Sequence, residues 1–323
     1  MGLAFTAGAA VITASGGVSD LGVVARALIV GVPTCIGLRT VVRHDNTRFG
    51  WTLIAVGAAL LVSTLAETDD ELAYTIGRSA GWVVQVLLVA LILTFPTGHL
   101  NGSVERALLG ATVLVVLTLF VPRLLLAEHF ELPSPYTSCT HGCPTNAFFA
   151  LDHQPGFVNG FMRPAGALMM VAVTWAVVLR LRERIRDASR LARRMFIPVL
   201  GVGVALLCIL CLGFVLRQAD PGAWPVQVLA GTLAMSAPAL ALAFLGATLR
   251  WQLDAGQALE RLAAWAPDAI DPLTLRLALA KAFDDPTLQI ALPEDGAARR
   301  SPDRDSGRVV SEVREDGALI AAV

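Results

Sequence analysis

The chain has 323 residues, of which 55% are hydrophobic and only 16% are charged, and its formal net charge at pH 7 is −1. A soluble domain of this length would carry nearer ~25% charged residues, so the composition argues against a conventional soluble protein. The charge pattern also lacks the basic footprint of a protein that binds nucleic acid. The lipid bilayer is therefore predicted to be the solvent for most of the chain.

Apolar stretches of membrane-spanning length follow one another up to residue 249. A helix crosses a ~30 Å bilayer core with about 20 residues, at a rise of about 1.5 Å per residue. The first stretch, residues 3–14, is too short for a regular span. It could form a clipped or re-entrant span, so whether it crosses the membrane is left open. Seven further spans are predicted, at residues 21–38, 51–65, 80–95, 107–126, 161–178, 196–216 and 226–249.

The arginines between the spans predict the orientation of the chain. Three arginines lie in the loop at 39–48 and seven in the loop at 180–194. Loops rich in arginine stay in the cytoplasm, so both loops are predicted to be cytoplasmic. Alternation then places the acidic loop at 67–71 and the long loop at 128–159 outside. We expect a multi-pass protein of the bacterial cell membrane whose C-terminal tail, after residue 250, is cytoplasmic.

Transporters keep ionisable residues near the middle of their spans, where these residues handle ions or substrates. We find none near the middle of the predicted spans, which argues against the alternative function of a small-molecule transporter. A non-signalling integral membrane protein is a further alternative. The arginines of the spans all lie near span ends, where their charged heads are expected to reach the interface; they are Arg26, Arg78, Arg106, Arg123 and Arg163.

The long outside loop contains the one constellation able to bind something, Cys139, His141 and Cys143, with His153 nearby. On the oxidising side of a membrane, two cysteines four residues apart favour a disulfide. A metal or redox-sensing site is the alternative, because the four residues are zinc-type ligands. Ligands separated by a single residue are not the usual structural-zinc spacing, so the disulfide is preferred and no catalytic, cofactor or metal residue is assigned.

Residues 250–270 are predicted to continue from the last span as a signalling or linker helix. Apolar residues recur in it at alternating spacings of four and three, as in the seam of a coiled coil. About two heptads are too few to distinguish a coiled coil from a helix that packs on the following domain. The seam residues are Trp251, Ala255, Ala258, Leu262 and Trp265.

Residues 271–323 are predicted to form a small α+β domain. A helix at 273–283 precedes a strand at 288–292, and a hairpin turns at Asp316-Gly317 within residues 308–323. Because the second strand ends at Val323 with an apolar, unfinished edge, we expect further chain to complete the sheet. The predicted fold is thus an all-α polytopic membrane bundle of seven or eight spans at 1–249, followed by an incomplete α+β domain.

Four segments resemble one family, the actinobacterial-type membrane sensor histidine kinases of two-component systems. They are residues 43–50 (RHDNTRFG), 93–100 (LTFPTGHL), 277–290 (LALAKAFDDPTLQI) and 309–321 (VVSEVREDGALIA). The last two resemble the linker helix, first strand and later hairpin of the GAF-like domain of these kinases. The resemblance implies a membrane sensor and transmitter that works as a homodimer in the bilayer.

In that family, the GAF-like region precedes a helix pair with the phospho-acceptor histidine and then an ATP-binding domain. All five histidines of this chain precede the tail, so none is assigned as the phosphorylated residue. The resemblance therefore implies a kinase truncated before its catalytic domains. ATP and Mg²⁺ are expected only in the missing kinase domain, and a response regulator only as a partner of that missing half. Whether the chain is an enzyme is left open.

Overall fold

The structure is a computed structural model that describes most of the first 249 residues and one hairpin near the C-terminus. The described residues are 2–15, 20–43, 46–95, 98–100, 102–132, 134, 137, 139, 142–187, 190–219, 224–236, 238–247, 249, 312–315 and 318–322. The chain divides into two compact units, residues 1–186 with 196–246, and residues 187–195 with 247–323.

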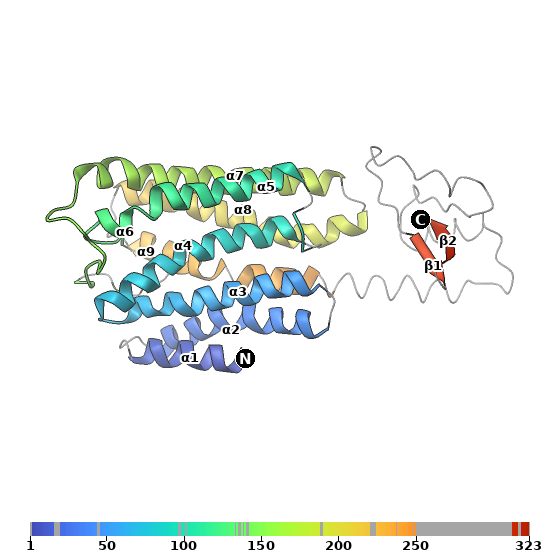
Figure 1. The fold of residues 1–323 in the computed structure, drawn as a ribbon, viewed down its shortest axis with the longest axis horizontal. Coiled ribbons are helices and arrows are strands. Elements are labelled where there is room, and N and C mark those ends of the chain that lie inside the picture. The colour runs from blue at the N-terminus through green and yellow to red at the C-terminus, as the bar shows by residue number, and fades with distance from the viewer. Residues whose placement is uncertain are drawn as a thin grey trace. The chain divides into compact units, whose positions relative to one another are not determined.

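Unit 1 is a bundle of helices that lie side by side with roughly parallel axes (Figure 1). Along the chain, α1 packs on α2, α2 on α3, α3 on α4 and α4 on α5. The regular α-helices are α1 (Gly2–Ser15), α2 (Asp20–Val42), α3 (Thr47–Ser63), α4 (Glu71–Thr94), α5 (Ser103–Val115), α6 (Arg123–Leu126), α7 (Arg163–Asp187), α8 (Arg190–Ala219) and α9 (Trp224–Ala234). The 3₁₀-helix η1 (Thr64–Glu67) and the π-helices η2 (Val116–Phe120) and η3 (Val158–Met162) extend α3, α5 and α7.

Five helical stretches are long and apolar enough to cross a membrane, which confirms five of the predicted spans. They are Gly22–Val42, Thr47–Glu67, Glu71–Thr94, Ser103–Leu126 and Val158–Arg186. The N-terminal segment is a helix of 14 residues, shorter than a full crossing as expected. The last two predicted spans are helical where the structure describes them, with shorter apolar helices at Ile197–Gly213 and Gly231–Ala247.

Polar residues next to the apolar runs determine where two of the spans begin. The side chain of Asn46 accepts a hydrogen bond from the backbone N of Phe49 at 3.2 Å and caps α3. Asp70 caps α4 in the same way by accepting from the backbone N of Ala73 at 2.8 Å. Such caps satisfy backbone N–H groups that have no partner within the helix.

Three phenylalanines form an aromatic cluster at the end of the bundle where α3 begins and α4 ends. Phe49 and Phe95 lie 5.8 Å apart between ring centroids, and Phe244 lies 5.1 Å from Phe49 and 4.7 Å from Phe95. All three side chains are buried. Edge-to-face and tilted pairs at these distances add to the burial of apolar area, so the cluster holds the helical segment around Phe244 against α3 and α4.

In unit 2, the structure describes the strands β1 (Glu312–Glu315) and β2 (Ala318–Ala322). They pair antiparallel, with Glu315 opposite Ala318 and Glu312 opposite Ala322, in the place where the sequence predicts a hairpin. The helix predicted at 273–283 and the strand predicted at 288–292 lie outside the described residues. So do the seam residues Trp251, Ala255, Ala258, Leu262 and Trp265.

Candidate functional site

The loop between α6 and η3 is attached to the bundle by the buried side chain of Asn146, which is 5% exposed. Its Nδ2 donates hydrogen bonds to the backbone carbonyl oxygens of Leu124 at 2.8 Å and Ala127 at 2.7 Å. Its Oδ1 accepts from the backbone N of Phe148 at 3.0 Å, and its own backbone N donates to the carbonyl of Glu128 at 2.9 Å. Asn146 therefore caps the carbonyl end of α6 and fixes the loop there.

The same stretch of loop is bonded to the first turns of α4. The hydroxyl of Thr145 donates to Oε1 of Glu71 at 2.5 Å. The backbone N of Ala147 donates to the hydroxyl oxygen of Thr75 at 3.0 Å. Three consecutive loop residues thus connect α4 to α6, and we call this end of the bundle the loop end.

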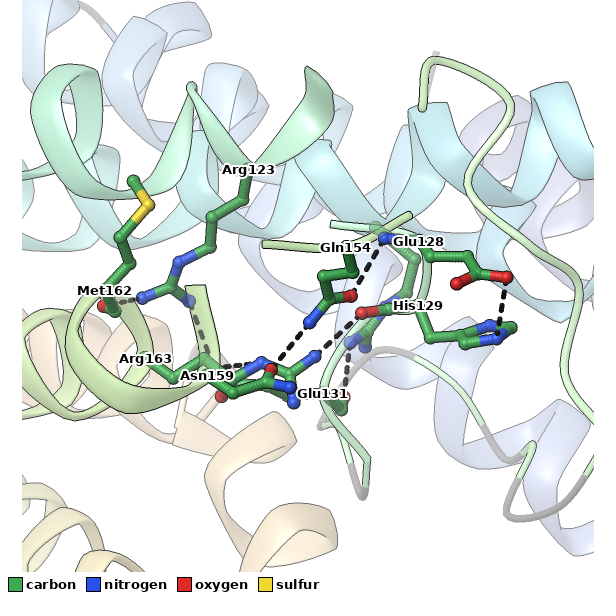
Figure 2. Close-up of polar contacts among 9 residues, drawn as sticks. Arg123, Glu128, His129, Glu131, Gln154, Asn159, Met162 and Arg163 are labelled. Atoms are coloured by element: carbon green, nitrogen blue, oxygen red, sulfur yellow. Dashed lines mark hydrogen bonds and ion pairs between the residues drawn. The ribbon is translucent and has the colours of Figure 1, made fainter. Parts of the chain in front are cut away.

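Arg123 of α6 is a buried cation at the loop end, with 7% of the residue's surface exposed. Its Nη1 lies 3.1 Å from Oε1 of Glu131, and its Nη2 donates to the backbone carbonyl of Met162 (Figure 2). The guanidinium carbon lies 4.7 Å from the centroid of the Phe120 ring. The cation is thus held by a carboxylate, a carbonyl and an aromatic face.

Glu131 also contacts arginine side chains from two further helices. Nε of Arg163, at the start of α7, lies 3.6 Å from the same Oε1, and its Nη2 donates to the carbonyl of His129 at 2.9 Å. Nη2 of Arg78, on α4, donates to the backbone carbonyl of Glu131 at 2.6 Å. Figure 2 shows Arg123 and Arg163 approaching Glu131 from separate helices. One loop residue therefore binds α4, α6 and α7 together.

The loop also contains a disulfide between Cys139 and Cys143, with their Cα atoms 5.8 Å apart. Cys143 lies two residues before Thr145, the loop residue at which the contacts to α4 begin. His141 lies outside the described residues. In the part of the chain that the structure describes, no group of three or more histidine, cysteine, aspartate or glutamate side chains is placed to hold a metal ion.

A second charge cluster lies at the opposite end of the bundle, which we call the arginine end. Glu105 of α5 is buried, with its side chain 2% exposed, and its Oε1 lies 3.0 Å from Nε of Arg180 and 3.7 Å from Nε of Arg184. Nη1 of Arg184 also donates to the backbone carbonyls of Leu93 at 3.0 Å and Phe95 at 3.3 Å. This cluster joins α7 to the start of α5 and the end of α4.

These networks are not apparent from the sequence, which predicts that the arginines near span ends reach the interface. The structure corrects this for Arg123, which is buried in an ion pair, and for Arg26, whose Nη2 lies 2.6 Å from Oε1 of Glu67 with side chains 12% and 2% exposed. Within a helix bundle, a nearby carboxylate stabilises the guanidinium better than a long reach to water does. The available signal was the placement of opposite charges at the same predicted end of different spans.

Comparisons with protein-family models, with curated proteins and with solved structures found no match for this chain. The arrangement must therefore be interpreted from its own chemistry. Each charge cluster holds cations and carboxylates in place and couples the ends of several helices. Guanidinium and carboxylate groups held in this way are suited to binding groups of opposite charge.

Proposed function

We propose that this chain is the sensory and transmitting membrane part of a two-component sensor histidine kinase. The observation that carries the proposal is the attachment of one loop to α4, α6 and α7 through Asn146, Thr145 and Glu131. A ligand or chemical change at this loop alters the contacts of three helix ends at once. That is the input a membrane sensor requires.

The arginine end supplies the output in this proposal. Glu105 and Arg184 connect α4, α5 and α7 there. Because α5 and α6 belong to one helical stretch, Ser103–Leu126, the same three stretches are coupled at both ends of the bundle. Packed helices move by small shifts and rotations between discrete arrangements, because a close-packed core does not deform continuously. A change at the loop end is therefore expected to select between two arrangements at the arginine end.

The proposal places the chain in the bacterial cell membrane, with the loop end outside and the arginine end and C-terminal tail in the cytoplasm. The arginine-rich segment 180–194, which comprises the end of α7 and the start of α8, supports this orientation. The tail would act as a GAF-like α+β domain, and its predicted seam would pair two copies of the chain. ATP, Mg²⁺ and the response regulator belong to a kinase half outside these 323 residues.

Cysteine cross-linking in native membranes tests the transmitting role. Leu262→Cys places a thiol on the predicted seam, and Glu260→Cys, two residues earlier, places one on the opposite side of the same helix. The background keeps the Cys139–Cys143 disulfide and replaces the three free cysteines of the described residues, which are Cys35, Cys208 and Cys211.

We expect Leu262→Cys to form a cross-linked dimer and the matched Glu260→Cys to remain uncross-linked. Adding Asn146→Ala, which removes one of the connections between the loop and α6, is expected to change the cross-linked fraction at Leu262→Cys. A strictly monomeric protein, or a cross-linked fraction insensitive to Asn146→Ala, would contradict the proposal. Sequencing the surrounding locus for a histidine-bearing helix pair and an ATP-binding domain then tests the assignment to a kinase.

A further inference from the structure

The loop end holds two guanidinium groups against one carboxylate oxygen. Nη1 of Arg123 lies 3.1 Å and Nε of Arg163 lies 3.6 Å from the same Oε1 of Glu131. The other polar contacts of these two arginines are to the backbone carbonyls of Met162 and His129. Among the described residues, no second carboxylate lies within ion-pair distance of either arginine, so two positive charges share one negative charge.

This imbalance is costly where the site is buried. The side chain of Arg123 is 9% exposed, so water compensates its charge poorly. A second oxyanion at this position would restore the charge balance, in a region where the low dielectric strengthens the attraction. Planar guanidinium groups match the oxygen pairs of carboxylates and phosphates in geometry as well as in charge.

The site is reachable from the loop side. The side chains of Arg163 and Glu131 are 29% and 27% exposed, in contrast to the buried Arg123. Glu131 itself belongs to the loop that follows α6 and not to a helix. An anion that approaches from this side therefore meets Arg163 first and competes with a side chain carried by the loop.

From this geometry we infer that Arg123 and Arg163 form a binding site for an oxyanion, a carboxylate or phosphate group, and that Glu131 is a tethered carboxylate occupying it when no ligand is bound. Binding of the external anion displaces the Glu131 side chain from both arginines. The loop then loses its ion-pair connection to α6 and α7 and keeps the connection through Asn146. This inference deepens the proposed function by naming the class of stimulus, and it rests on that function only for the signalling consequence.

Anion binding to the purified chain in nanodiscs tests the site directly. The probes are inorganic phosphate and acetate, measured by calorimetry in discs of zwitterionic phosphatidylcholine. Glu131→Gln removes the tethered competitor, and the matched control Glu128→Gln removes an exposed carboxylate of the same loop that contacts His129 rather than the two arginines. Helix content by circular dichroism verifies that each variant is folded.

We expect Glu131→Gln to bind at least one of the two probes about tenfold more tightly than the unmodified chain. A tenfold gain corresponds to about 1.4 kcal/mol of binding free energy, which the anion no longer spends on displacing the Glu131 carboxylate. Glu128→Gln should match the unmodified chain. Adding Arg163→Gln to Glu131→Gln should abolish the gain. Equal affinities for Glu131→Gln and Glu128→Gln, or a gain that survives Arg163→Gln, would overturn the inference.

Discs that contain anionic phosphatidylglycerol distinguish the source of the oxyanion. If these lipids abolish the gain in phosphate affinity that Glu131→Gln shows in zwitterionic discs, the occupant is a lipid headgroup, and the site is supported. If phosphate binds equally in both kinds of disc, the occupant is a soluble anion. Because this assay does not involve the tail, anion binding without any change in tail cross-linking would overturn the signalling role and leave the binding site standing.

Discussion

Gly37 of α2 and Gly50 of α3 face each other so closely that neither position has room for a side chain. A Cβ on Gly37 would lie 2.8 Å from the carbonyl oxygen of Gly50, and a Cβ on Gly50 would lie 2.9 Å from the carbonyl oxygen of Gly37. At both positions a backbone oxygen of the facing helix is in the way, and backbone cannot rotate away as a side chain does. The two helices therefore pack through their backbones, as small residues allow in membrane bundles.

The first prediction is that Gly37→Ala destabilises the bundle. The added methyl group forces α2 and α3 apart, and overpacking of this kind costs about 1–3 kcal/mol of unfolding free energy. The measurement is loss of helical circular dichroism during titration of detergent-solubilised protein with sodium dodecyl sulfate. The matched control is Gly110→Ala on α5, where a Cβ meets nothing within 4 Å, and a change there within about 1 kcal/mol is expected. Equal stability of the two variants would refute the close contact.

The second prediction concerns the arginine end. Glu105→Gln removes the carboxylate from Arg180 and Arg184, and we expect a loss of roughly 3 kcal/mol, as for other buried ion pairs deprived of one partner. The same titration measures it. Glu183→Gln is the matched control, because Glu183 also contacts Arg180, at 3.1 Å, but has a side chain 59% exposed. Its removal should cost less than about 1 kcal/mol. A larger loss in the control would contradict the assigned role of Glu105.

The spans were predictable because hydropathy reports the apolar centre of a helix directly. The ends of the helices were not predictable, because polar residues there lower the hydropathy. The fourth helix of the bundle illustrates this: the apolar run predicts a span at 80–95, but α4 begins at Glu71. Its first two turns contain Tyr74, Thr75 and Arg78, which lower the apolar signal. The structure satisfies these residues by contacts with the loop, such as the bond from Ala147 to Thr75.

The charge networks were not predictable in the same way, because a sequence shows charges but not their partners. Arg26 and Glu67 are 41 positions apart, and only the folding of α2 against η1 brings them together. Asn146 gave no signal, since a single asparagine in a loop is an ordinary turn residue. Its role depends on the approach of the loop to the end of α6, which no local pattern encodes.

The third prediction is that Asn146→Ala weakens the attachment of the loop to α6. The carbonyls of Leu124 and Ala127 lose their donor, and leaving such buried groups unsatisfied costs about 1–3 kcal/mol each. We expect faster amide hydrogen exchange in residues 124–127 and 146–150, measured by mass spectrometry in nanodiscs. Asn159→Ala is the control, because this exposed asparagine accepts a bond from the side chain of Gln154 at 2.7 Å and is not part of the contact with α6 that Asn146 makes. Unchanged exchange in Asn146→Ala would show that other contacts hold the loop.

The last prediction concerns orientation. If the loop end is outside, a membrane-impermeant maleimide should label Cys139 and Cys143 in intact cells once their disulfide is reduced, and not before. The free cysteines at 35, 208 and 211 lie within helices of the bundle, so the reagent should not reach them across the bilayer. Arg182→Cys, at an exposed position of the arginine end, should be labelled only after the membrane is permeabilised. The opposite pattern would place the arginine end outside against the charge rule, and the oxyanion site would then face the cytoplasm.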